Sequence, residues 1–173
     1  MMNPRAIAIV GNSGAGKTTL LERLIPALKR KGYRLGAIKH DAHRFDIDHP
    51  GKDSHRLAAA GADTMVITSA EKLAMVKRHA ASPPIEEILA SYFTGTDLVL
   101  VEGFRGSSLP KIEVHRKEFD RALICRGERT DSGLAAVASD EPLDLDVPVL
   151  DLNDPEAIAE FIASLLSRNE GNP

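Results

Sequence analysis

The stretch RAIAIVGNSGAGKTTL, residues 5–20, decides the fold of this chain. Residues 6–10 form a short apolar run that is rich in isoleucine and ends at a glycine, which is typical of a buried strand. Residues 11–18 then fit the pattern G-x-x-x-x-G-K-[ST], and leucines at helical spacing follow from Leu20. A strand, a glycine-rich turn and a helix in this order predict a loop that binds the phosphates of a nucleoside triphosphate.

Each residue type in this loop has a chemical reason. Gly11, Gly14 and Gly16 allow backbone N–H groups to curl around phosphate oxygens, because no Cβ stands in the way. We expect Lys17 to act as the catalytic cation that reaches the β- and γ-phosphates, and the Thr18 hydroxyl to bind Mg²⁺. The residues expected to contact the nucleotide here are Gly11, Asn12, Ser13, Gly14, Ala15, Gly16, Lys17, Thr18 and Thr19.

Strand-like and helix-like runs alternate along the rest of the chain. Further strands are expected at residues 33–39, 64–69, 73–77, 97–101, 111–114, 122–125, 134–138 and 148–150. Helices are expected after the loop to Gly32 (disturbed by Pro26), at about 53–60, from Ser82–Pro83 to about 93, and from Asp154–Pro155 onward. This alternation predicts an α/β fold with three layers and a mostly parallel sheet, to whose edge residues 64–77 add an antiparallel hairpin. We expect one nucleotide-binding domain over residues 1–167 and a frayed tail over 168–173.

Composition narrows the classes of function. The formal net charge of -3 and the 4% aromatic content argue against a nucleic-acid binder. No apolar run approaches the length that spans a bilayer, and the first strand begins too early to leave room for a signal peptide, so a cytoplasmic protein without a membrane partner is expected. The single cysteine, Cys125, lies in an apolar run and is expected to be a small buried core residue.

A second acidic element is needed for Mg²⁺, and two acids flank the most strand-like run in the chain. Asp97 precedes the run and Glu102 ends it, about 16 Å farther along the strand. Because ligands of open α/β sheets lie at the carboxyl ends of strands, we assign the metal-binding and catalytic carboxylate to Glu102. Gly103 directly after it allows a close approach of the backbone.

Residues 39–54, KHDAHRFDIDHPGKDS, are dense in histidine and aspartate. Three interpretations remain open for this segment. It could bind a transition metal, or act as a switch over the γ-phosphate in which Asp41 or Asp46 orients Mg²⁺ or water, or be a solvated loop whose aspartates cap turns.

Several motifs taken together resemble one bacterial family. IVGNSGAGKTTL, IKHDAHRFDIDHPGKDS, DLVLVEGF and AVASDEPLDLDVPVLDLND are similar to the molybdopterin-guanine dinucleotide biosynthesis adapter proteins (MobB), over residues 5 to about 165. The resemblance implies a homodimeric GTP-binding protein with weak hydrolysis. It would assist the transferase that joins GMP to molybdopterin, and it could bridge that transferase to the molybdenum-insertion enzyme. The residues that match the middle segment of the family are His40, His43, Asp46, Asp48, Gly51, Lys52 and Asp53.

Two positions depart from patterns seen in related proteins. A lysine early in the loop, which reaches across the dimer in one related subclass, is replaced by Asn12. The common guanine-reading N-K-x-D is absent, and Asp140 is our candidate to accept hydrogen bonds from the guanine N1–H and 2-amino groups.

Two other functions use the same loop. A small-molecule kinase would need a lid of arginines, for which residues after Glu102 are available, and a metallochaperone-type GTPase would work through the histidine-rich segment. The candidate lid residues are Arg105, Arg116, Arg121, Arg126 and Arg129.

Overall fold

The structure is a computed structural model that describes residues 4–40, 45–119, 122–126 and 130–168. It contains two compact units, one of residues 1–40 and 85–173 and the other of residues 41–84, which are described separately. The single domain expected over residues 1–167 stays a prediction. The expected frayed tail lies outside the described residues from 169 onward.

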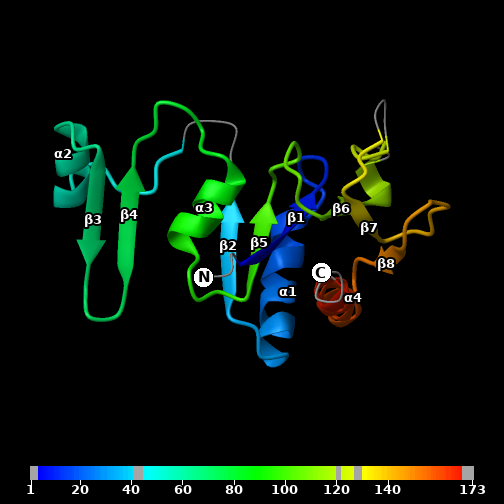
Figure 1. Cartoon of the computed structure of the whole chain (residues 1–173). Coiled ribbons are helices and arrows are strands. Elements are labelled where there is room, and N and C mark those ends of the chain that lie inside the picture. Colours follow the sequence, from blue (N-terminus) through cyan, green and yellow to red (C-terminus); the bar gives the residue numbers. More distant parts are fainter. Residues whose placement is uncertain (1–3, 41–44, 120–121, 127–129, 169–173) are drawn as a thin grey trace. The chain divides into compact units, whose positions relative to one another are not determined.

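The first unit is built on a parallel sheet of six strands in the order β2-β5-β1-β6-β7-β8 (Figure 1). All its strand pairs are parallel, so their carboxyl ends meet at one edge. The bounds of the strands are β1 Arg5–Val10, β2 Leu35–Lys39, β5 Leu98–Glu102, β6 Lys111–His115, β7 Leu134–Ser139 and β8 Val149–Asp151.

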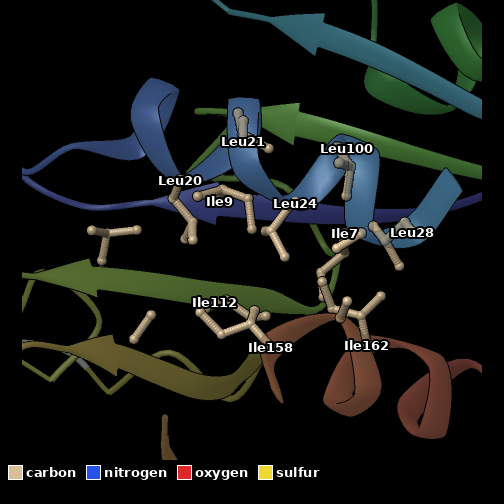
Figure 2. Packing of buried hydrophobic residues seen from close by; sticks show 14 of the residues in the cluster. Ile7, Ile9, Leu20, Leu21, Leu24, Leu28, Leu100, Ile112, Ile158 and Ile162 are labelled. Atoms are coloured by element: carbon tan, nitrogen blue, oxygen red, sulfur yellow. The ribbon is translucent and has the colours of Figure 1, made fainter. Parts of the chain in front are cut away.

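Helices cover both faces of this sheet and make the predicted three layers. The helices α1 (Lys17–Arg30) and α4 (Pro155–Arg168) pack against one face, and α3 (Ile85–Tyr92) packs against the other. Alternate residues of β1 serve the two faces, since Ile7 and Ile9 belong to the first cluster whereas Ala8 and Val10 belong to the second. Figure 2 shows α1 and α4 contributing leucines and isoleucines to the first cluster around Ile7 and Ile112.

The helix α1 starts directly after the glycine-rich turn and holds it against the core. Leu24 and Leu28 are fully buried, and the helix continues through Pro26 without interruption. It ends as expected near Gly32, whose φ of 92° is the left-handed conformation that glycine adopts without strain. The N-terminal end of the helix is therefore fixed relative to β1.

The second unit holds a short helix and a hairpin. These are α2 (Asp53–Ala59) and the antiparallel pair β3 (Thr64–Thr68) and β4 (Leu73–Lys77). The expected hairpin is present, but its place at the edge of the parallel sheet was wrong, because β3 and β4 form a two-stranded sheet of their own.

Two other expectations were wrong. Residues 122–125 do not form a strand; instead the Glu113 carboxyl group accepts the backbone N–H groups of Ile124 (2.6 Å) and Cys125 (2.9 Å). The helix α3 begins at Ile85 rather than at Ser82–Pro83, because a residue that precedes a proline, as Pro83 does, is disfavoured in helical conformation.

Cys125 is fully buried, as expected from its apolar run. Burial, reinforced by the nearby Glu113 carboxyl group, raises the pKa of its thiol to about 12. Within the described residues, no helix combines the length and the apolar character needed to cross a membrane.

Truncation of Leu24 tests this packing. Leu24→Ala should lower the free energy of unfolding by about 3 kcal/mol, because it leaves a cavity between α1 and the sheet. Glu22→Ala, on the exposed side of the same helix, should change it by less than about 0.5 kcal/mol in the same urea titration. Equal effects of the two substitutions would contradict the assignment of Leu24 to the core.

Candidate nucleotide-binding site

The glycine-rich turn between β1 and α1 is shaped by positive backbone angles. Gly11, Gly14 and Gly16 have φ values of 143°, 83° and 91°. At Gly11 a Cβ would also lie 2.5 Å from the backbone oxygen of Val114 on β6, so a side chain is excluded there by contact as well. The turn therefore needs glycine at these positions for the reasons that the motif predicted.

Lys17 lies across this turn. Its Nζ donates hydrogen bonds to the backbone oxygens of Gly11 (3.0 Å) and Asn12 (2.9 Å), and the residue is half-buried. The ammonium group is thus held inside the curl of the loop, where an anion bound by the backbone N–H groups would meet it.

Thr18 and Glu102 lie in direct contact. The Thr18 hydroxyl donates to Glu102 Oε2 at 2.8 Å, and Lys39 Nζ lies 3.3 Å from Oε1 of the same carboxylate. Glu102 ends β5, which pairs with β1 through Ile9, and its side chain is 12% exposed. The structure thereby brings together the two oxygen groups that the sequence assigned to Mg²⁺, and both are hard donors of the kind that this ion prefers.

The other candidate acid lies at the opposite end of β5. Asp97 forms a paired interaction with Arg34, whose guanidinium lies 2.6 Å from Asp97 Oδ1. Side-chain and backbone hydrogen bonds from Arg34 lower the pKa of Asp97 to about 2. Asp97 thus fastens the start of the strand and lies away from the phosphate loop.

The backbone directly after Glu102 has an uncommon conformation. Gly103 and Phe104 both have positive φ, 93° and 54°, and Phe104 is the non-glycine residue with this feature in the described chain. A Cβ on Gly103 would lie 3.2 Å from the backbone oxygen of His40, and the His40 ring contacts the Phe104 ring at 4.2 Å between centroids. The close approach expected at Gly103 is therefore present, with His40 as its neighbour.

The segment after β6 borders the phosphate loop on its other side. Arg116 Nε donates to the backbone oxygen of Ala15 at 3.2 Å, and Asn12 Nδ2 donates to the backbone oxygen of Ala122 at 3.3 Å. Phe119, in a short 3-10 turn (Lys117–Phe119), lies 3.5 Å from the position that a Cβ on Gly14 would take. From the sequence Arg116 was considered as a lid residue, and its contact with the phosphate loop was missed, because that contact depends on the strand order that places β6 beside β1.

Asp140 lies at the carboxyl end of β7, one strand beyond β6. Its Oδ1 accepts the backbone N–H of Lys117 at 2.9 Å, and its Oδ2 lies 3.7 Å from Arg116 Nη1. The candidate base-reading carboxylate is therefore placed at the same edge of the sheet as the phosphate loop, and connected to it through Arg116.

The arginines considered for a kinase lid make structural contacts. Arg105 donates to the backbone oxygen of Ile124, and Arg126 forms a paired interaction with Asp146 and also donates to the backbone oxygens of Cys125 and Asp131. Arg121 and Arg129 lie outside the described residues. Arg105 and Arg126 thus hold the segment after β6 together, which weakens the kinase interpretation for these two arginines.

The histidine-rich segment is only partly described. Asp41 and His43 lie outside the described residues, whereas Asp46 and Asp48 belong to the second unit. The Asp48 carboxylate is hydrogen-bonded by Ser54 and by the backbone N–H of His49, which lowers its pKa. In the described part of the chain, no three histidine, cysteine, aspartate or glutamate side chains are grouped so as to hold a metal ion.

Comparison with known proteins identifies the family of the chain. The model of the family described as "Molybdopterin guanine dinucleotide synthesis protein B" (MobB) matches residues 6–140. The chain belongs to this family. This MobB chain is 40% identical to the molybdopterin-guanine dinucleotide biosynthesis adapter protein of Escherichia coli over 95% of both chains. It is also 40% identical to that of Haemophilus influenzae, over 95% of this chain and 91% of the relative.

Solved structures of MobB proteins are similar in fold to this chain. The crystal structure of Bacillus subtilis MobB matches with a TM-score of 0.72 and 28% identity, over 92% of this chain and 96% of that one. A MobB homolog from Bacillus stearothermophilus matches with a TM-score of 0.69 and 27% identity, over 96% and 99%. The α/β fold expected from the sequence is confirmed.

Proposed function

We propose that this protein is a GTP-binding adapter in the synthesis of molybdopterin-guanine dinucleotide. It binds GTP with Mg²⁺ at the phosphate loop and assists the transferase that joins GMP to molybdopterin. The observation that carries the proposal is the Thr18–Glu102 contact beside Lys17, in a chain whose 40% identical relatives are named as adapters of this pathway.

The residues of the loop have distinct parts in this function. Lys17 would exchange its bonds to the loop carbonyls for bonds to phosphate oxygens, so that its positive charge stays where it is already held. Thr18 and Glu102 would hold Mg²⁺ through a hydroxyl and a carboxylate oxygen. When bound, this ion neutralises the charge of the triphosphate.

Hydrolysis is proposed to be slow and secondary. The residue proposed to orient the attacking water is Asp41, on the segment that follows β2. An adapter needs the nucleotide mainly as a bound ligand, and Glu102, as the proposed ligand of Mg²⁺ beside Lys39, would not be free to act as a base.

The proposed partners follow from the same reading. They are the molybdopterin guanylyltransferase, the molybdenum-insertion enzyme and a second copy of this chain, and the proposed location is the cytoplasm.

The hairpin of the second unit supports the homodimer. Val66 is 48% exposed and Leu73 is 64% exposed, and they share one face because Val66 pairs with Met75, two residues from Leu73. Exposed apolar side chains on a two-stranded sheet are typical of a surface that another chain covers.

Loss of the loop cation tests the nucleotide site. Lys17→Ala should weaken binding of GTP with Mg²⁺ by at least 100-fold in calorimetry, since a charge-assisted contact to phosphate worth about 3 kcal/mol is removed. Circular dichroism should show an unchanged fold.

Glu102→Gln should instead weaken the dependence of GTP affinity on Mg²⁺, measured as the ratio of the affinities with and without the ion. In a reconstituted guanylyl-transfer assay, wild-type protein should raise product formation and Lys17→Ala should not; unchanged GTP affinity in Lys17→Ala would refute the mechanism.

The proposed guanine contact is tested by changing its hydrogen-bonding pattern. Asp140→Asn should lower affinity for GTP and raise affinity for xanthosine triphosphate, because the amide can donate to the 2-oxo group that replaces the guanine 2-amino group. We expect the ratio of the two affinities to change by at least 100-fold, or about 3 kcal/mol. Retention of the wild-type preference by Asp140→Asn would remove Asp140 from base recognition.

The dimer surface is tested by charge. The double substitution Val66→Lys and Leu73→Lys should convert a dimer into a monomer in analytical ultracentrifugation, since burying two ammonium groups in an apolar contact is costly. Tyr92→Lys, at an exposed aromatic residue of the first unit, should leave the dimer intact. A monomeric wild-type protein, or a dimer unaffected by the two lysines, would contradict this surface.

A further inference from the structure

Arg116 contacts both halves of the proposed nucleotide site. It directly follows β6, and its Nε donates to the backbone oxygen of Ala15 in the phosphate loop at 3.2 Å. Its Nη1 lies 3.7 Å from Oδ2 of Asp140 at the end of β7. The side chain is 28% exposed and therefore mostly buried.

The guanidinium lies close to Gly16 of the loop. A Cβ on Gly16 would come within 3.1 Å of Arg116 Nε and 3.2 Å of Nη2. A side chain at residue 16 would therefore push the guanidinium away from its present place, and the positive φ of Gly16 disfavours a side chain there as well. A planar group with several fixed N–H donors can serve two partners at once in this way, whereas an ammonium group is a single point.

Neighbouring contacts fix the same junction between β6 and β7. The backbone N–H of Lys117 donates to Asp140 Oδ1 at 2.9 Å, and His115 Nε2 lies 3.0 Å from Glu141 Oε1. The residues that follow β6 thus contact both oxygens of Asp140, Oδ1 through a hydrogen bond and Oδ2 through a longer ion pair. Each carboxylate oxygen has a second lone-pair direction, so Asp140 can still accept hydrogen bonds from a base.

We propose that Arg116 is a positioning residue for base selection, which sets the place of Asp140 relative to the phosphate loop. This inference rests on the proposed function, in which Asp140 accepts hydrogen bonds from guanine. The phosphates fix one end of the nucleotide in the loop, and the bridge through Arg116 fixes the carboxylate that meets the other end. Without the bridge, phosphate binding persists but the carboxylate loses its alignment with the guanine edge, so the preference for GTP over ATP falls.

The substitution Arg116→Lys separates this geometric role from a role of charge alone. Lysine keeps the positive charge beside the phosphates but cannot hold Ala15 and Asp140 together. Arg116→Met removes the charge and the bridge together. The matched control is Arg105→Lys, because Arg105 also follows Glu102 and donates to a backbone oxygen, that of Ile124, which belongs neither to the phosphate loop nor to the end of β7.

The experiment measures, by calorimetry with Mg²⁺, the affinities for GTP, ATP and inorganic tripolyphosphate. Arg116→Lys should bind tripolyphosphate within about threefold of wild type and lose at least tenfold of its preference for GTP over ATP. In an Asp140→Ala background the same substitution should cause no further loss of preference. Arg105→Lys should behave as wild type.

Three results would overturn the inference. The first is an unchanged preference for GTP over ATP in Arg116→Lys. The second is a loss of this preference in Arg116→Met but not in Arg116→Lys, which would indicate a role of charge. The third is an equal loss of the preference in the wild-type and Asp140→Ala backgrounds. The wild-type and Asp140→Ala proteins test the proposed function separately. If wild type has no preference, or Asp140→Ala keeps it, guanine reading by Asp140 fails and the inference falls with it. If those two proteins behave as expected, failure of the Arg116 variants refutes the positioning role alone.

Discussion

The parallel pairing of β1 with β5 and β6 is the constraint on which the rest of the site depends. Because β1 lies between these strands, its carboxyl end meets Glu102 on one side and the residues after His115 on the other. The phosphate loop then continues from β1 and closes the space between them. Neither the Thr18–Glu102 contact nor the Arg116–Ala15 contact could form if the strands ran in opposite directions.

The parts of the site that follow a local rule could be predicted from the sequence. The turn at residues 11–16 has a fixed pattern of residue types, and the choice of Glu102 over Asp97 needed only the rule that ligands lie at carboxyl ends of strands. The sheet with helices on both faces followed from apolar periodicity in the same way. Each of these inferences used residues that are close in sequence, or a property shared by all parallel sheets.

The parts that depend on long-range contacts could not be predicted. Residues 122–125 have an apolar pattern that is typical of a strand, yet their N–H groups bond to the buried Glu113 side chain, and no local pattern encodes that partner. The place of Arg116 depends on the strand order, which puts β6 beside β1 although about a hundred residues of chain separate them. The hairpin had a correct local pattern, but which sheet it joins is decided by contacts elsewhere.

The two hydrogen bonds to Glu113 have a consequence for how this family can vary. The connection between β6 and β7 is attached to the sheet by side chains, through Glu113, and through Lys111, whose Nζ lies 3.2 Å from Asp131 Oδ2. A connection fastened at a few points can gain or lose residues between them without altering the register of any strand. The border of the candidate nucleotide site can therefore change in length while the phosphate loop keeps its geometry.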